Sequence, residues 1–153
     1  MQDCSTQRLV LVWQSDSAYR SLIQKVLAEH DAHPNVVVID YMQDASDFLQ
    51  CQGNYTARPR PDLILLDLEL AGESPDSEAF TGYDLLSMLK TDSRLKRIPI
   101  IVLTMSDSPE DIVKTYTVQG NCYVIRPGDR DQLVQTIQRI EDFWLNIVTL
   151  PSE

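Results

Sequence analysis

Residues 61–70 contain a short apolar run, Leu63-Ile64-Leu65-Leu66, that ends on the acidic side chain of Asp67. A run of Leu and Ile with almost no polar interruption is typical of a strand that is buried on both faces, as in a parallel sheet covered by helices. Asp67 then stands at the carboxyl end of a central strand, the edge of such a sheet where ligands collect. The carboxylate is therefore a candidate phosphoryl acceptor or metal ligand, although an ordinary Asp that caps a turn would give the same pattern.

Strand patterns alternate with helix patterns along the rest of the chain. Besides the run that ends at Asp67, strands are expected at residues 9–13, 36–39, 99–103 and 122–125. Helices are expected at residues 17–30, about 44–51, 81–91, 108–120 and about 129–148. This alternation predicts right-handed crossovers and a flavodoxin-like, doubly wound (βα)5 three-layer sandwich, whose parallel sheet has the order 2-1-3-4-5.

Two of these helices carry recognisable end signals. Thr81 and Asp84 resemble a capping box at the start of the third helix. Ser108, followed by Pro109, is the expected N-cap of the fourth helix. Gly120 is expected at the C′ position of that helix, because glycine adopts the left-handed conformation there without a Cβ penalty.

Composition narrows the class of protein. The chain has 153 residues, 43% hydrophobic and 24% charged, which fits one globular domain over residues 1–153. The net charge of −10, without a cluster of Lys and Arg, argues against a nucleic-acid partner. An odd number of cysteines without metal-ligand spacing, a polar N-terminus and the lack of an apolar stretch of about 20 residues predict a reduced cytoplasmic protein without a membrane segment.

Polar residues follow four of the expected strands. They are Gln14, Ser15 and Asp16 after the first strand, Asp67 after the third, Thr104 after the fourth, and Arg126 with Pro127 after the fifth. Because the carboxyl ends of parallel strands share one edge of the sheet, one polar crevice is expected to collect these side chains.

Four segments together resemble one known family. They are Pro-Asp-Leu-Ile-Leu-Leu-Asp-Leu at 61–68, Leu-Lys-Arg-Ile-Pro-Ile-Ile-Val-Leu-Thr at 95–104, Asn-Cys-Tyr-Val-Ile at 121–125 and Ile-Glu-Asp-Phe-Trp-Leu-Asn-Ile-Val-Thr-Leu-Pro at 140–151. The chain resembles the receiver domain of response regulators, and more narrowly the small cyanobacterial regulators that partner phytochrome histidine kinases. The resemblance implies a two-component signalling protein that works with a sensor histidine kinase and has no DNA-binding output domain.

The resemblance also assigns roles to individual residues. It implies that Asp67 is the phosphoacceptor, that Thr104 bonds a phosphoryl oxygen, that Tyr123 is the switching aromatic residue, and that the backbone carbonyl of Glu69 is a Mg²⁺ ligand together with Asp67. A carboxylate can take a phosphoryl group from a phosphohistidine, and the product gains negative charge and strong acceptor oxygens. Taken alone, Thr104 would be an ordinary strand end and Tyr123 a half-buried strand aromatic.

Gln14 and Ser15 depart from the family pattern. They stand where the family carries the pair of acids that hold Mg²⁺ with the phosphoacceptor. Mg²⁺ prefers carboxylate oxygens, so without the acid pair the remaining candidate ligands are Asp67, one backbone carbonyl and Asp16. The alternative role of Asp16 is the N-cap of the first helix. We therefore expect weak or absent Mg²⁺ binding, and weak, slow or absent phosphorylation by the usual route.

Arg126 is the second departure, because the family has Lys-Pro where this chain has Arg126 and Pro127. Arginine is a planar fork and lysine a compact ammonium, so the exchange is not conservative at a tight phosphate site. Arg126 could instead clamp Asp67 by charge-assisted hydrogen bonds and so replace the ion. The resemblance suggests a cis peptide at Pro127, whereas a plain turn proline is the alternative.

The tail at about 141–151 extends the last helix and is more apolar than one face of a terminal helix requires. Phe143, Trp144 and Ile147 are candidate interface residues: the resemblance implies a homodimer, and a tail folded back on its own domain is the alternative. The acidic segment 70–81 is expected to be a long loop, with an insertion that has no assigned role.

Two function classes stay open. The first is a receiver that accepts a phosphoryl group on Asp67, and the second is a degenerate receiver, locked by Arg126, that serves as a phosphorylation-independent binding or scaffold protein. An enzyme such as a small hydrolase has little support, because neither a glycine-rich phosphate loop nor a Ser-His-Asp set is visible. We therefore expect an interaction module with at most weak self-phosphorylation.

Overall fold

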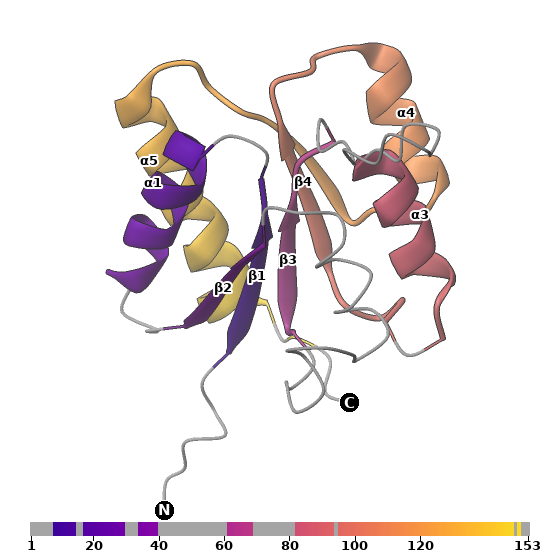
Figure 1. Cartoon of the computed structure of the whole chain (residues 1–153), viewed down its shortest axis with the longest axis horizontal. Helices are drawn as coiled ribbons and strands as arrows, with labels where there is room; N and C mark the ends of the chain where they lie inside the picture. Colours follow the sequence, from indigo (N-terminus) through magenta and orange to yellow (C-terminus); the bar gives the residue numbers. More distant parts are fainter. Residues whose placement is uncertain are drawn as a thin grey trace, which may run out of the picture.

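The computed structural model describes residues 8–14, 17–29, 34–39, 61–68, 82–93, 95–148 and 150. The elements, labelled in Figure 1, are β1 (Leu9–Trp13), α1 (Ser17–Ala28), β2 (Asn35–Ile39), β3 (Leu63–Leu66), α3 (Gly82–Thr91), β4 (Ile100–Thr104), α4 (Pro109–Thr117), β5 (Cys122–Ile125), α5 (Arg130–Glu141) and η3 (Asp142–Ile147). The expected strands are confirmed. The helix expected at about residues 44–51 and the loop at 71–80 lie outside the described residues.

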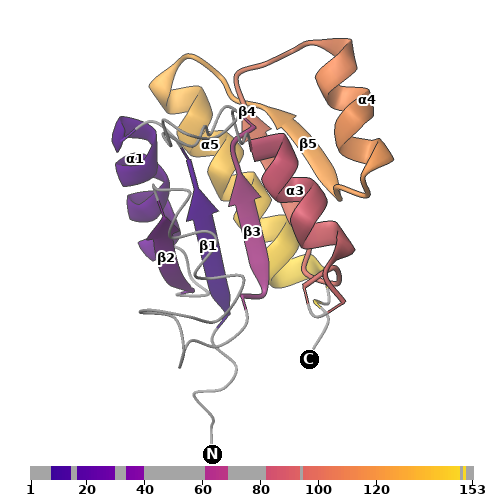
Figure 2. The same ribbon diagram turned by 45° about the vertical axis from the view of Figure 1, so that its right-hand side comes forward.

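The strands form one parallel sheet with the order β2-β1-β3-β4-β5. This is the flavodoxin-like order that was expected. Figure 2 shows β1 and β3 side by side in the middle of the sheet, with their arrowheads at the same edge. The residues that follow β1, β3, β4 and β5 therefore lie along one edge, as the polar crevice requires.

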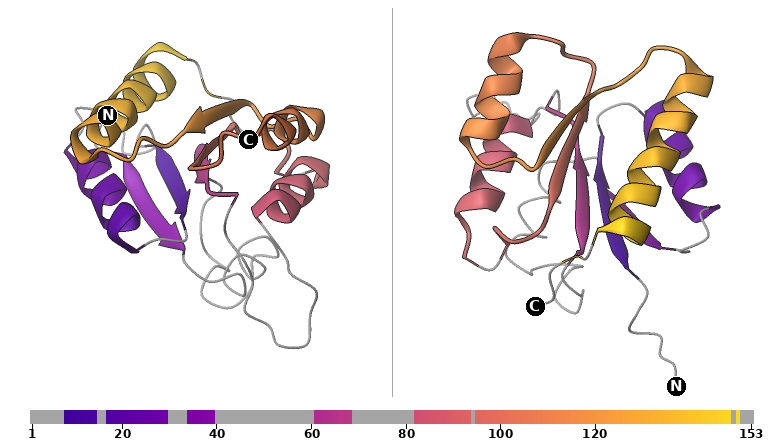
Figure 3. Two further views of the ribbon diagram at one scale, coloured as in Figure 1. Left: turned by 90° about the horizontal axis from the view of Figure 1, so that it is seen from above. Right: turned by 180° about the vertical axis from the view of Figure 1, so that it is seen from behind.

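Helices cover both faces of the sheet. Figure 3, seen from above, shows α1 and α5 on one side and α3 and α4 on the other. The three layers explain why the strands are continuous apolar runs, because each strand must present side chains to helices on both of its faces. All residues of β1, β3 and β4 are buried.

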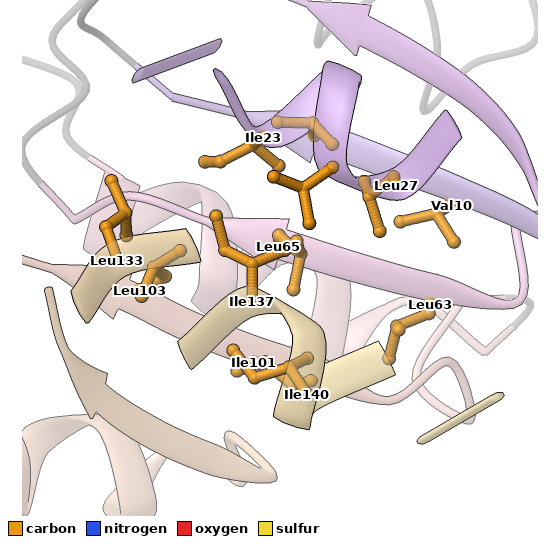
Figure 4. Close-up of a cluster of buried hydrophobic side chains, with 12 residues drawn as sticks. Val10, Ile23, Leu27, Leu63, Leu65, Ile101, Leu103, Leu133, Ile137 and Ile140 are labelled. Carbon is orange, nitrogen blue, oxygen red and sulfur yellow. The ribbon is translucent and has the colours of Figure 1, made fainter. Parts of the chain in front are cut away.

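Alternate strand residues belong to two separate hydrophobic clusters. Leu11 and Trp13 of β1 pack in the cluster that contains the buried leucines of α3, whereas Val10 and Val12 pack in the cluster under α1 and α5. Figure 4 shows the second cluster, in which Ile137 of α5 lies near the centre of the group. The sheet thus divides the core into two clusters, and packing on both faces holds the strands, and with them their carboxyl ends, in place.

The end of α4 corrects one prediction. Gln119, not Gly120, holds the left-handed position after the helix, with a φ of 76°. The Gln119 and Gly120 N–H groups donate to the carbonyls of Tyr116 (3.0 Å) and Thr115 (2.9 Å), the paired bonds of a Schellman motif. Glycine is needed one residue later for space, because a Cβ on Gly120 would lie 2.6 Å from Cγ2 of Thr115.

The last helix begins as expected, since the Asp129 carboxylate caps it by accepting from the Gln132 N–H at 3.0 Å. It does not continue as one α-helix to residue 148, because the α-helical part ends at Glu141 and a π-helix follows in η3. The wider π turn changes which side chains face the domain. Trp144 packs against the cluster under α1 and α5, while Phe143 and Ile147 are 49% and 70% exposed.

Candidate functional site

Asp67 directly follows β3 at the shared edge of the sheet. Its backbone N–H donates to the carbonyl of Trp13 at 2.8 Å, so the chain continues the β1–β3 pairing up to this residue. The N-terminus of α3 closes over the same point, since a Cβ on Gly82 would collide with the Asp67 carbonyl oxygen. Asp67 is fully buried as a result, and its carboxylate depends on neighbouring side chains for compensation.

Thr104 and Arg126 contribute to that compensation. The Thr104 hydroxyl donates to Oδ1 of Asp67 at 3.0 Å, and Nη1 of Arg126 lies 3.7 Å from Oδ2. Arg126 thus lies beside Asp67 as an ion pair, although the distance is too long for the charge-assisted hydrogen bond of the clamp. The backbone joins the same residues, because the Arg126 N–H donates to the Thr104 carbonyl at 2.7 Å.

Arg126 is held in place by two residues near the end of β1 and the start of α1. Its Cζ lies 3.8 Å from the centroid of the Tyr19 ring, a close cation–π contact, and its Nη1 donates to Oε1 of Gln14 at 3.2 Å. Arg20 holds the Gln14 backbone by donating to its carbonyl at 2.9 Å. Sequence analysis did not identify Tyr19 as a site residue, because nothing local to Tyr19 indicates its arginine partner.

The buried arginine and glutamine leave hydrogen-bond capacity unused. Gln14 is fully buried and Arg126 is 5% exposed. Neither Nε2 of Gln14 nor Nε of Arg126 has a hydrogen-bond acceptor within the described part of the chain. Buried donors of this kind are costly and usually have an explanation in function. In the described part of the chain, the site thus places several donors around the Asp67 carboxylate.

Tyr123 connects this site to the start of α4. Its hydroxyl donates to the carbonyl of Ser106 at 2.8 Å, two residues beyond Thr104. The Ser106 hydroxyl donates to Asp111 of α4 at 2.6 Å and accepts from the Ser108 N–H at 3.3 Å. Ser108 makes no side-chain cap, so Ser106 and Asp111, which sequence reasoning missed, tie the β4–α4 turn to the helix.

The fit of these residues to Mg²⁺ is poor. The described residues contain no group of three or more His, Cys, Asp or Glu side chains that could hold a metal ion. An ion bound to Oδ2 of Asp67 at about 2.1 Å would stand within roughly 6 Å of Nη1 of Arg126. At an effective dielectric of about 20, the repulsion between the double and single charges is about 5 kcal/mol.

Three predicted site residues cannot be assessed in this way. Ser15, Asp16 and the Glu69 carbonyl lie outside the described residues. The structure contains no cis peptide among the residues it describes, so Pro127 is a plain trans turn proline. The candidate interface residues of η3 lie beyond Glu141, where α5 ends, and belong to a different region from the Asp67 site.

Comparison with known proteins decides what kind of domain carries this site. A family model described as the response regulator receiver domain matches residues 10–138. The chain belongs to the response regulator receiver family. It is a receiver-type response regulator, as the sequence motifs implied, and receiver domains are generally signalling modules that bind Mg²⁺. The scaffold reading of the degenerate site is therefore not favoured.

Individual relatives agree with the family. The response regulator Rcp1 of a Synechocystis species is 35% identical over 145 residues, which cover 95% of this chain and 94% of that protein. The structure is similar to that of the phosphorylated cyanobacterial phytochrome response regulator RcpA, at 36% identity, a TM-score of 0.86 and coverage of 95% and 99%. The Mn²⁺-bound form of Rcp1 gives a TM-score of 0.85 at the same identity and coverage.

One further finding concerns membranes. Within the described segments, no helix combines the length and apolar character needed to cross a bilayer.

Proposed function

We propose that this receiver domain accepts a phosphoryl group on Asp67 from the phosphohistidine of a sensor histidine kinase of the phytochrome type. The observation that carries the proposal is the arrangement of the Asp67 carboxylate, fully buried between the Thr104 hydroxyl and the Arg126 guanidinium. Both groups are suited to hold the extra negative charge and acceptor oxygens of an acyl phosphate. The similarity to a regulator that is phosphorylated, RcpA, supports the same chemistry.

The switch would run from Thr104 through Tyr123. A phosphoryl group on Asp67 would recruit the Thr104 hydroxyl more strongly than the carboxylate does, because it offers more charge and more acceptors. Movement at the end of β4 would shift Ser106, to which both Tyr123 and Asp111 are bonded. We infer that phosphorylation changes the position of the start of α4, and so the surface that a downstream partner meets.

A bound metal ion would contribute less to phosphorylation here than in a receiver domain that keeps the acid pair. The proposed ligands are Asp67, the Glu69 carbonyl and, weakly, Asp16. Gln14 is neutral, and its Oε1 already accepts a hydrogen bond from Nη1 of Arg126, so Gln14 is poorly suited to replace a carboxylate. We expect weak Mg²⁺ binding and slow phosphorylation, with at most weak self-phosphorylation from small donors.

The partners follow from the same proposal. A kinase of the phytochrome type would meet the chain in the cytoplasm, and nucleic acid and membranes are not expected as partners. We propose one receiver domain over residues 1–153, with an extension at about 141–151 that forms a homodimer. The support is the exposure of Phe143 and Ile147, although Trp144 packs on its own domain.

Phosphorylation is tested by treating the protein with acetyl phosphate or phosphoramidate in Mg²⁺ and measuring its intact mass. We expect one added phosphoryl group that hydroxylamine removes, and none in Asp67→Asn. Asp107→Asn is the matched control, because Asp107 is an exposed acid in the β4–α4 turn. Wild type without an adduct, or an adduct that persists in Asp67→Asn, would reject the proposal.

The dimer is tested by size-exclusion chromatography with light scattering. We expect a dimer for the wild type and a monomer for Ile147→Asp, because a charge would be buried in the interface without a partner. A monomeric wild type at high concentration would exclude the homodimer while leaving the phosphorylation proposal intact.

A further inference from the structure

We propose that phosphorylation of Asp67 needs no divalent cation, because Arg126 supplies the positive charge at this site. The inference rests on the proposed function of Asp67 as the phosphoacceptor, and it concerns how that reaction is supported. Its basis is the way Gln14 and Tyr19 hold the guanidinium beside the carboxylate, while the Thr104 carbonyl fixes the Arg126 backbone.

Among the residues that the structure describes at this site, the buried charges balance. Asp67 contributes one negative charge and Arg126 one positive charge, while Gln14 and Thr104 are neutral. Since all four residues are at most 5% exposed, water contributes little to charge compensation at this point. A carboxylate with a buried cation beside it does not need a second, doubly charged cation to be neutralised.

Arg126 is also held rigidly enough to act without rearrangement. The Tyr19 ring supports one face of the guanidinium at 3.8 Å, and Oε1 of Gln14 accepts from Nη1 at 3.2 Å. The Arg126 backbone is fixed by its bond to the Thr104 carbonyl. A positive group fixed before the reaction stabilises charge that develops later more effectively than one that must first be oriented.

Unused donors indicate what would bind there. Nε of Arg126 and Nε2 of Gln14 are buried and lack an acceptor among the described residues. A phosphoryl group brings three acceptor oxygens to the neighbourhood of Asp67. The donors match an oxyanion, whereas they would oppose a metal cation, which requires lone pairs at the positions that these N–H groups occupy.

The chemical step balances without a metal. An oxygen of the Asp67 carboxylate forms a bond to the phosphorus of phosphoramidate, and the phosphorus–nitrogen bond breaks. The electron pair of that bond goes to nitrogen, which already carries three protons in the phosphoramidate monoanion and leaves as ammonia. Arg126 stays protonated throughout and faces the charge that builds up on the phosphoryl oxygens.

The test compares the rate of phosphorylation of the wild type by phosphoramidate in excess EDTA and in Mg²⁺, with intact mass as the readout. We expect the two rates to agree within about twofold, because the cation contributes nothing that Arg126 does not supply. Asp67→Asn must stay unlabelled in both solutions.

Two sets of variants make the test specific to Arg126. Arg126→Lys keeps the positive charge but loses the planar guanidinium and its contact with the Tyr19 ring. We expect the rate of phosphorylation of this variant in EDTA to fall by roughly 100-fold. Arg97→Lys is the matched control, since Arg97 is exposed before β4. The triple variant Gln14→Glu/Ser15→Asp/Arg126→Lys restores the acid pair, and its labelling should require Mg²⁺.

Metal binding gives a second readout that does not depend on the reaction. Trp13 is buried and directly precedes Gln14, so its fluorescence reports ligands at this edge of the sheet. Titration with Mg²⁺ should bring the fluorescence change of the triple variant to saturation, whereas the wild type, which binds Mg²⁺ weakly, should stay far from saturation over the same concentration range.

The outcomes separate the two proposals. Labelling of the wild type that is equal in EDTA and Mg²⁺, and lost in Arg126→Lys, supports metal-independent phosphorylation. Labelling in Mg²⁺ alone, or full labelling of Arg126→Lys in EDTA, overturns the role of Arg126 and leaves Asp67 as the phosphoacceptor. No labelling of the wild type in either solution overturns both proposals.

Discussion

Glu141 is a buried carboxyl group that should make the stability of the domain depend on pH. It is the last residue of α5 and is 1% exposed. Burial, with a smaller contribution from repulsion by Asp142, raises the pKa of Glu141 from 4.5 to about 8. We predict that Glu141→Gln raises the free energy of unfolding at alkaline pH and leaves it nearly unchanged in mild acid.

The sign follows from proton linkage. The folded protein keeps the Glu141 proton over the range in which the unfolded chain has already released it, so the contribution of Glu141 to stability is most favourable below pH 4.5 and falls as the pH rises towards 8. Each pKa unit corresponds to about 1.4 kcal/mol, so the penalty reaches about 2 kcal/mol near pH 6 and about 4 kcal/mol near pH 8. The amide has no such penalty, and the expected gain near pH 8 is roughly 2–4 kcal/mol.

Urea unfolding followed by circular dichroism, at about pH 5 and about pH 8, measures this difference. Glu110→Gln is the control, because Glu110 is an exposed carboxylate on α4 and its removal should change stability little at either pH. Equal effects of Glu141→Gln at both pH values, or a loss of stability near pH 8, would refute the reasoning.

Three further substitutions test the packing and hydrogen bonds of the fold. Gly120→Ala should lower the free energy of unfolding by about 1–3 kcal/mol, because the new Cβ would lie 2.6 Å from Cγ2 of Thr115, and an unchanged thermal midpoint would contradict this. Lys90→Met should cost about 2 kcal/mol in urea unfolding, since Nζ donates to Oδ1 of Asn121 at 2.7 Å and to two carbonyls, while burial already lowers the Lys90 pKa; a neutral result would mean that these bonds contribute nothing. Tyr123→Phe should cost about 1 kcal/mol and speed amide exchange in the β4–α4 turn, and exchange as slow as in the wild type would exclude that role.

The sheet could be predicted from local sequence because its strands are short apolar runs with clear limits. Residues 9–13 and the run before Asp67 are buried on both faces in the structure, as their composition implied. The strand order, the family and the edge at which polar residues gather followed from the alternation of elements and from the family motifs. Each of these features is confirmed.

Helix ends were less predictable. Gly120 was expected to close α4, because glycine is the usual residue in the left-handed conformation. Gln119 adopts that conformation instead, and glycine is required at position 120 because Thr115 lies too close for a Cβ. The change from α5 to a π-helix after Glu141 was also missed. Apolar spacing at the end of a helix does not distinguish four-residue from five-residue hydrogen bonding, since packing against the domain decides between them.

The sequence by itself determined which polar side chains stand at the carboxyl edge of the sheet, because strand ends follow directly from apolar runs. Their partners depend on tertiary packing. Gln14 and Arg126 are 112 positions apart and yet share a hydrogen bond, and the cation–π contact with Tyr19 joins the same two ends of the chain. Contacts of this range arise only when α1 and β5 pack on the same sheet, so no local pattern could have revealed that Gln14 and Tyr19 hold the Arg126 guanidinium beside Asp67.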